Sequence, residues 1–150
     1  MREAITADLK TATLARDKQR TGALRLISAA IKDRDIVARG AGQPQASDTE
    51  LVDLLAKMVK QRLESARISE ENGRAELAEQ ERAEIAVIEH YLPKQLSEDE
   101  AKAAIAKVIA DTGAAGVKDM GKDMAELKTR HAGQMDFSKA SAAVKAALTA

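Results

Sequence analysis

The sequence predicts an all-α protein, and three features of its composition and pattern indicate this. Only two aromatic residues, Tyr91 and Phe137, occur among 150 residues. The core must therefore be built from Ala, Leu, Ile, Val and Met, which suit close packing between helices. Apolar residues recur at intervals of three and four, and proline and glycine are scarce. We expect an N-terminal bundle with a long helical hairpin, followed by a small three-helix tail domain.

Two helices are expected in the first 40 residues. The first is marked by apolar residues at helical spacing: Ile5, Leu9 and Ala12. Asp17 can cap the second, because a short acidic side chain accepts a hydrogen bond from the exposed amides of a first turn. One face of this second helix carries three aliphatic residues: Leu24, Ile27 and Ile31. Gly40 and Gly42, followed by Pro44, predict its end.

A hairpin of two longer helices is expected next. Ser47 and Glu50 have the spacing of a capping box. An apolar stripe follows: Leu51, Leu55, Met58 and Leu63. Asn72-Gly73 predicts the end of this helix, because asparagine and glycine readily adopt the left-handed conformation that ends helices. The returning helix carries four apolar residues before Pro93: Leu77, Ile85, Ile88 and Leu92. A short turn between two long helices predicts an antiparallel pair.

Pro93 and the second capping-box pattern, Ser97 with Glu100, predict the domain boundary. We expect an N-terminal helical domain over residues 1–93 and a tail domain over residues 94–150. Three groups of apolar residues mark its short helices: Ile105, Val108 and Ile109; Met120, Met124 and Leu127; Phe137, Val144 and Leu148. Asp136 can cap the last helix.

The charges balance overall but are unevenly distributed. Residues 1–40 carry nine basic and five acidic side chains, residues 41–93 six and eleven, and residues 94–150 nine and eight. This argues against a strong non-specific nucleic-acid binder, which is usually basic over a whole domain. The chain has no cysteine, which excludes disulfides and thiol catalysis. A membrane span would need a run of about 18 apolar residues, and the sequence has no such run. We therefore expect a cytoplasmic protein.

No pattern predicts a cofactor, a metal or a catalytic centre. The segment from Gly116 to Lys122 resembles a phosphate-binding P-loop, but Asp123 replaces the hydroxyl residue that would hold magnesium, and no strand precedes it. His90 and His131 have no partner at metal-ligand spacing. An acidic run could hold a divalent cation: Glu76, Glu79, Glu81, Glu84 and Glu89. We expect instead a solvated helix face, paired with nearby arginines.

Basic side chains in the tail domain are the candidate binding residues: Lys118, Lys122, Lys128, Arg130 and Lys139. Such a group could contact several phosphates and position a nucleic acid without reading its sequence. The near absence of aromatic residues disfavours binding by base stacking. The alternative, an ordinary solvated surface, stays open from composition alone.

Two motifs carry a family resemblance: Tyr91-Leu92-Pro93 with Gln95-Leu96-Ser97, and Asp119-Met120-Gly121-Lys122. Less specific matches cover Leu24–Lys32, Met58–Ser65 and Gly73–Ile85. On these residues the chain resembles the YqeY family, stand-alone relatives of the C-terminal tail of the B subunit of tRNA-dependent glutamine amidotransferases. It departs from the expected pattern at Gly22, at Ile68-Ser69 and at Asp123, which would remove charge from the phosphate-binding face.

The resemblance implies a tail domain that holds tRNA near its elbow, whereas amide transfer belongs to a separate domain with no counterpart here. Our first hypothesis is a non-catalytic tRNA-associated accessory module without a cofactor, with Arg62 and Arg74 as second-rank contacts. The second is a protein-interaction module that docks on an amidotransferase, an aminoacyl-tRNA synthetase or another translation factor. The third is a carbon–nitrogen ligase that takes its amido nitrogen from glutamine.

Overall fold

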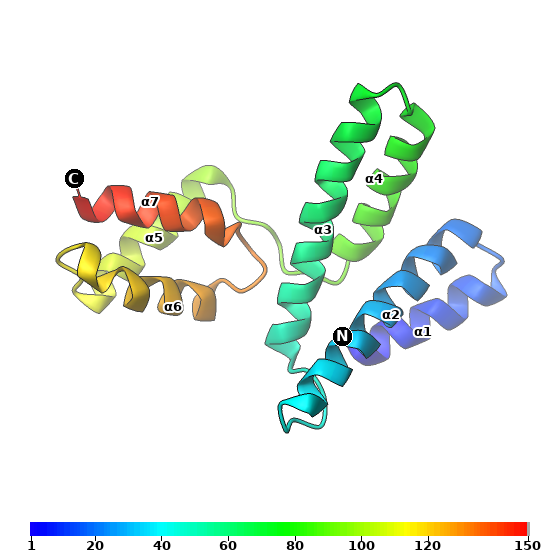
Figure 1. Ribbon diagram of the computed structural model, residues 1–150, viewed down its shortest axis with the longest axis horizontal. Helices are drawn as coiled ribbons and strands as arrows, with labels where there is room; N and C mark the ends of the chain where they lie inside the picture. Colours follow the sequence, from blue (N-terminus) through cyan, green and yellow to red (C-terminus); the bar gives the residue numbers. More distant parts are fainter. Residues whose placement is uncertain (150) are drawn as a thin grey trace. The chain divides into compact units, whose positions relative to one another are not determined.

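The computed structural model describes residues 1–149 (Figure 1). Over these residues it contains seven α-helices, one 3-10 helix and no strand, which confirms the all-α prediction. The chain divides into two compact units, Met1–Leu92 and Pro93–Ala150. We call them the N-terminal unit and the tail unit, and each is described by itself.

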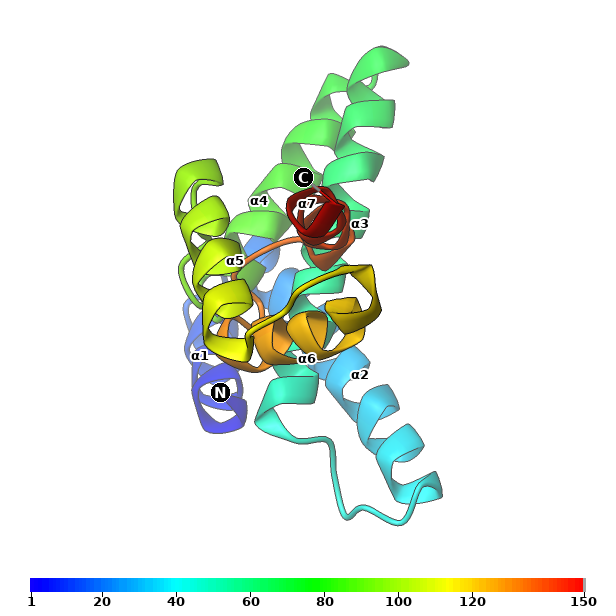
Figure 2. The same ribbon diagram turned by 90° about the vertical axis from the view of Figure 1, so that its left-hand side faces the viewer.

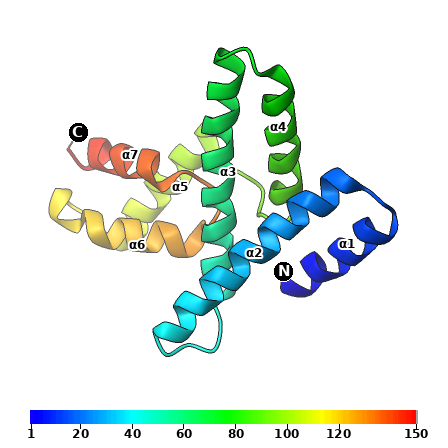
Figure 3. The ribbon, with the colours of Figure 1, turned by 45° about the vertical axis from the view of Figure 1, so that its right-hand side comes forward.

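The N-terminal unit begins with two helices joined by a tight turn, α1 (Arg2–Leu14) and α2 (Lys18–Gly40). Figure 3 shows α1 folded back beside α2. Arg16 adopts a left-handed conformation in the turn, with φ of 56°. Asp17 caps α2 as predicted, because its carboxylate accepts a hydrogen bond from the backbone N–H of Arg20 at 3.1 Å.

The next two helices, α3 (Asp48–Glu71) and α4 (Ala75–Glu89), form the predicted hairpin (Figure 1). Ser47 begins it with a full capping box. The Ser47 hydroxyl oxygen accepts from the N–H of Glu50 at 3.2 Å, and the Glu50 carboxylate accepts from the N–H of Ser47 at 3.4 Å. Gly73 reverses the chain with φ of 74°, a conformation that costs glycine little.

The core of the N-terminal unit is aliphatic. Six of its large side chains are almost fully buried: Ile5, Leu24, Ile27, Leu51, Leu55 and Ile88. Two predicted core residues, Leu63 and Leu77, are instead exposed, by 52% and 39%. Leu63 follows Met58 by five positions, which turns it about 140° away from the stripe. The small residues Ala66 and Ala78 are buried in their place, because they let the two backbones approach closely.

The hairpin also buries a polar pair that corrects one expectation. Glu81, predicted to lie on a solvated acidic face, is only 8% exposed and accepts a hydrogen bond from the Ser69 hydroxyl at 3.0 Å. Arg62 on α3 pairs with Glu84 on α4, with 3.1 Å between Nε and the carboxylate. Polar side chains therefore join the two helices as well as aliphatic ones.

Asp35 ties three distant segments of the N-terminal unit together. Both of its carboxylate oxygens accept from the guanidinium of Arg2, at 2.8 and 2.7 Å, and one also accepts from the N–H of Ala46 at 2.9 Å. Arg2 in turn donates to the carbonyl of Ala46 at 2.8 Å. The Arg2 guanidinium and the Ala46 amide hold the pKa of Asp35 well below its usual range.

Tyr91, the single tyrosine, follows the end of α4 and connects it to α1. Its hydroxyl donates to the carboxylate of Asp8 on α1, 83 positions earlier. Burial of the ring, followed by this contact with Asp8, raises the pKa of Tyr91 to about 12, although Arg20 acts in the opposite direction. The first residue of the Tyr-Leu-Pro motif therefore has a structural role.

The tail unit contains α5 (Glu98–Thr112), the 3-10 helix η1 (Val117–Asp119), α6 (Met120–Arg130) and α7 (Phe137–Thr149). Figure 2 shows its three α-helices packed as a small bundle. Their shared core contains five buried residues: Ile105, Val108, Leu127, Ala140 and Val144. Ser97 caps α5 through the N–H of Glu100 at 3.2 Å, and Asp136 accepts from the N–H of Ser138 at 2.9 Å as α7 begins.

The Gln-Leu-Ser motif holds the start of the tail unit against the loop between α6 and α7. Leu96 donates its N–H to the carbonyl of Gln134 at 2.8 Å, and the side chain of Gln95 donates to the carbonyl of Gly133. Gln134 donates back to the carbonyl of Lys94 at 3.3 Å. These bonds give the second part of the motif a structural role as well.

We expect Asp35→Asn to lower the urea midpoint of unfolding at neutral pH, because it removes the charge that pairs with Arg2. The pKa of Asp35 is depressed in the folded state, so its stabilising effect is complete above the unfolded pKa of about 3.9. That effect is lost as the pH falls further toward the folded pKa. The difference between wild type and variant should therefore shrink below about pH 4. Asp33→Asn, an exposed charge on the same helix, is the control, and equal midpoints for both variants would contradict this role.

We also expect the folded protein to form tyrosinate only near pH 12, against about 10 for a free tyrosine. The stabilisation from neutral Tyr91 is present below about pH 10 and is lost as the pH rises through the folded pKa. Alkaline absorbance measures this directly, because the chain has one tyrosine and no tryptophan. Asp8→Asn should lower the pKa only part of the way, since burial is the larger cause. Glu3→Gln on the same helix should leave it unchanged.

Candidate nucleic-acid interface

Four of the predicted contact residues are exposed lysines of the tail unit. Lys118 lies in η1, Lys122 and Lys128 lie in α6, and Lys139 lies in α7. Within residues 1–149, none of the four makes an ion pair or a side-chain hydrogen bond. Their ammonium groups are therefore available to an external anion.

The helical phases show that these lysines do not all share one face. Lys122 lies nearly opposite the core side of α6, which Leu127 occupies. Lys118 precedes it by four positions, in the 3-10 helix that leads into α6. Lys128 is six positions after Lys122, which turns it about 120° around the helix. Lys139 adjoins buried Ala140 on a different helix, α7. Lys118 and Lys122 are therefore the two lysines that lie together where α6 begins.

Arg130, the fifth predicted contact, is already bound to carboxylates of its own unit. Its guanidinium lies 2.7 Å from Asp111 on α5 and 2.8 Å from Glu126 on α6. The hydrogen bond to Asp111, and to a smaller extent the one to Glu126, raises the pKa of Arg130 above its ordinary value. A phosphate would have to compete with both carboxylates for this side chain.

The two second-rank candidates lie in the N-terminal unit and differ in their surroundings. Arg62 is committed to Glu84, and their side chains are only 20% and 15% exposed. Arg74 precedes α4 at its N-cap position, is exposed, and makes no side-chain cap. Of the two, only Arg74 presents its charge to solvent.

Asp123 lies in the core of the tail unit, so the expectation that it weakens a phosphate-binding face is wrong. Its side chain is fully buried. One carboxylate oxygen is hydrogen-bonded to the hydroxyl of Thr112, at the end of α5, and the other has no partner among the described residues. This contact joins α6 to α5, and Lys122, next to Asp123 in the chain, is exposed. A polar residue type gave no signal of this burial.

The histidines take part in local contacts. His131 Nδ1 lies 3.0 Å from the side-chain oxygen of Gln134. The rings of His90 and Tyr91 pack edge to face, with 5.1 Å between their centroids. Across the described part of the chain, no three His, Cys, Asp or Glu side chains gather as a metal ion would require. None of the helices there has the length and apolarity needed to cross a membrane.

A protein-family model agrees with the two motifs, and it matches almost the whole chain. The model of the Yqey-like protein family matches residues 2–148. The chain belongs to this family. The predicted resemblance is thereby confirmed.

Three curated relatives share one name, "Altered inheritance of mitochondria protein 41, mitochondrial". The protein of Lachancea thermotolerans is 28% identical over 143 residues, covering 94% of this chain and 75% of the relative. That of Kluyveromyces lactis is 32% identical over 111 residues, covering 72% and 58%. That of Saccharomyces cerevisiae is 31% identical over 88 residues, covering 59% and 46%. The last match therefore spans about half of that yeast protein.

These names contradict the expectation of a cytoplasmic protein. All three relatives are named as mitochondrial proteins. The cytoplasmic assignment rested on composition and on the lack of a long apolar run, neither of which indicates the compartment in which the members of a family are found. That assignment is therefore wrong.

We expect Thr112→Val to destabilise the tail unit, because it removes the one hydrogen-bond partner of a fully buried carboxylate. Leaving such a group unpaired should cost about 2–3 kcal/mol. Amide hydrogen exchange measures this, as lost protection in α5, α6 and α7. Thr129→Val is the matched control, because Thr129 is exposed and bonds only to a backbone carbonyl of its own helix. Unchanged protection in Thr112→Val would show that this contact does not hold the two helices together.

Proposed function

We propose that this chain is a non-catalytic, tRNA-associated accessory module that contacts RNA through the lysines of its tail unit. The observation that carries the proposal is the contrast between arginines that are bound to carboxylates and exposed lysines that are not. In the N-terminal unit, five arginines are bound to carboxylates: Arg2, Arg34, Arg62, Arg67 and Arg82. The four tail lysines, by comparison, have no such partner among the described residues.

The placement of the lysines supports contact with phosphates and not with bases. Lys118 and Lys122 are the primary pair, since both lie on the solvent side where α6 begins. The partial positive charge of a helix start adds to their attraction for an anion. Lys128 and Lys139 lie on other sides and would add contacts only to a partner that curves around the unit. A folded RNA, which presents its phosphates in several directions, is such a partner.

The remaining predicted contacts have a smaller part in this proposal. Arg130 would contribute only by exchanging a carboxylate for a phosphate, and Arg62 only by leaving Glu84. Arg74 is exposed and can act as an accessory contact. The relatives' names add one consideration, because RNA from mitochondria belongs among the ligands to be tested.

We expect the double variant Lys118→Gln/Lys122→Gln to bind tRNA more weakly than wild type and with a shallower salt dependence. Each lost phosphate contact should reduce the slope of log K against log salt by about 0.7–0.9. A salt series with total tRNA and with mitochondrial tRNA measures both quantities. The charge-matched control is Lys102→Gln/Lys107→Gln, which removes two exposed lysines from α5. Equal affinities and slopes for the two double variants, or no tRNA binding by wild type at low salt, would overturn the proposal.

A further inference from the structure

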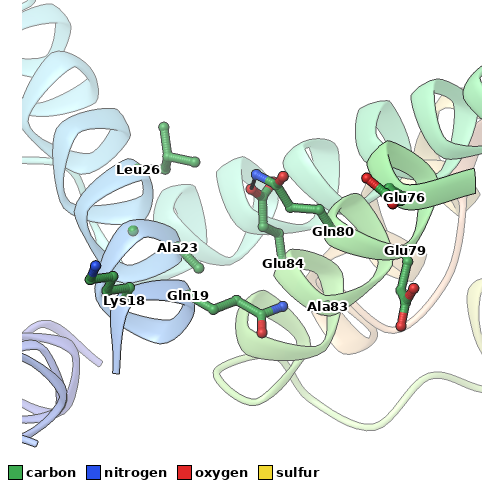
Figure 4. Close-up of a pocket in the computed structure, with 10 residues that line it drawn as sticks. Lys18, Gln19, Ala23, Leu26, Glu76, Glu79, Gln80, Ala83 and Glu84 are labelled. Atoms are coloured by element: carbon green, nitrogen blue, oxygen red, sulfur yellow. Dashed lines mark hydrogen bonds between the residues drawn. The ribbon is translucent and has the colours of Figure 1, made fainter. Parts of the chain in front are cut away.

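The N-terminal unit contains a groove that the RNA proposal does not use. It has a volume of about 840 Å³ and lies between α2 and α4. Five residues of each helix line it: Lys18, Gln19, Gly22, Ala23 and Leu26 on α2, and Glu76, Glu79, Gln80, Ala83 and Glu84 on α4. Figure 4 shows Gln19 extending from α2 toward α4, and Gln80 and Glu84 extending from α4 toward α2.

The groove has the shape of an empty position for a further helix. Its lining residues recur at intervals of three and four on both helices, so each wall is one continuous helix face about two turns long. Small residues lie in both walls, Gly22 and Ala23 in the middle of the α2 wall and Ala83 toward the end of the α4 wall, and Leu26 adds a half-exposed apolar side chain. Small residues on a helix face let another helix approach at close range.

Gly22 leaves open space on the outer side of this wall. It lies within α2, where glycine is a poor helix former. A Cβ built on Gly22 would meet no atom within 4 Å. Nothing in the described chain therefore requires a glycine at this position, whereas the close approach of a partner's backbone would.

The charges of the groove indicate the chemistry of that partner. The lining residues include three carboxylates, Glu76, Glu79 and Glu84, and one ammonium group, that of Lys18. Glu84 is neutralised by Arg62, but Glu76 and Glu79 have no cationic partner among the described residues. This acidic wall repels phosphate and attracts basic side chains. An apolar floor beside it fits the two faces of an amphipathic helix.

We propose that the groove between α2 and α4 binds a basic amphipathic helix of a partner protein. The small side chains of the partner helix pack against Gly22, Ala23 and Ala83, and its lysines or arginines pair with Glu76 and Glu79. The proposal does not depend on RNA binding, because it uses the N-terminal unit alone. Lys118→Gln/Lys122→Gln should therefore leave helix binding unchanged, which separates the failure of one proposal from failure of the other.

The probe is a labelled synthetic peptide of about 14 residues, or four helical turns, with Leu and Ala on one face and Lys on the other. Fluorescence anisotropy should show saturable binding to the full chain. The same peptide with Glu in place of Lys should not bind. If the two peptides bind equally, or if neither binds, the proposal is overturned.

Two variants locate the binding. Glu79→Gln should weaken it about threefold, whereas Glu89→Gln, an exposed charge on α4 outside the groove, should not. Gly22→Leu should weaken it roughly tenfold by filling the groove, while thermal unfolding shows an equal or higher midpoint, since a Cβ at this position meets no atom within 4 Å and leucine is the better helix former. Lower stability of Gly22→Leu would assign the glycine an internal role. That result, or peptide binding unaffected by both groove variants, would overturn the proposal.

Discussion

The N-terminal unit depends on one buried carboxylate. Asp35 accepts hydrogen bonds from the guanidinium of Arg2 and from the amide of Ala46, so it joins the start of α1, the C-terminal part of α2 and the residue just before the cap of α3. A carboxylate is costly to bury, but a bidentate arginine and a backbone amide together satisfy most of its hydrogen-bonding capacity. The direction in which the chain enters α3 therefore follows from this contact and from the capping box at Ser47 that comes directly after it.

The direction in which the chain enters α3 determines where the hairpin of α3 and α4 lies in this unit. The hairpin of α3 and α4 is held internally by Arg62 with Glu84 and by Ser69 with Glu81, so it behaves as one element once α3 is placed. Tyr91 then ties the end of the hairpin to Asp8 on α1. With both ends of the hairpin attached to the first two helices, the acidic side of α4 is held facing the glycine-containing side of α2.

Features that depend on local chemistry could be predicted from the sequence. The caps at Asp17, Ser47 and Ser97 follow from side chains that satisfy amides within one turn. The bond between Arg2 and Asp35 spans 33 positions, and no local pattern distinguishes that aspartate from its exposed neighbour Asp33. At the candidate site, the exposure of the lysines follows from their type. The angle between Lys122 and Lys128 follows from their spacing. The burial of Asp123 beside Lys122 does not, because a polar residue type gives no signal of it.

Arginine and lysine have different roles in this chain, and the chemistry of the side chains explains why. A guanidinium offers a planar set of donors that fits a carboxylate, so arginine suits internal ion pairs such as Arg62 with Glu84 and Arg130 with Asp111. A lysine ammonium is a strongly hydrated point charge on a flexible stem. It suits contacts with phosphates at variable geometry, as proposed for Lys118 and Lys122. An acidic groove in one unit and unpaired lysines in the other would attract partners of opposite charge. A chain with no net charge can therefore keep a basic protein segment and an RNA on separate surfaces, and neither partner would compete for the other's site.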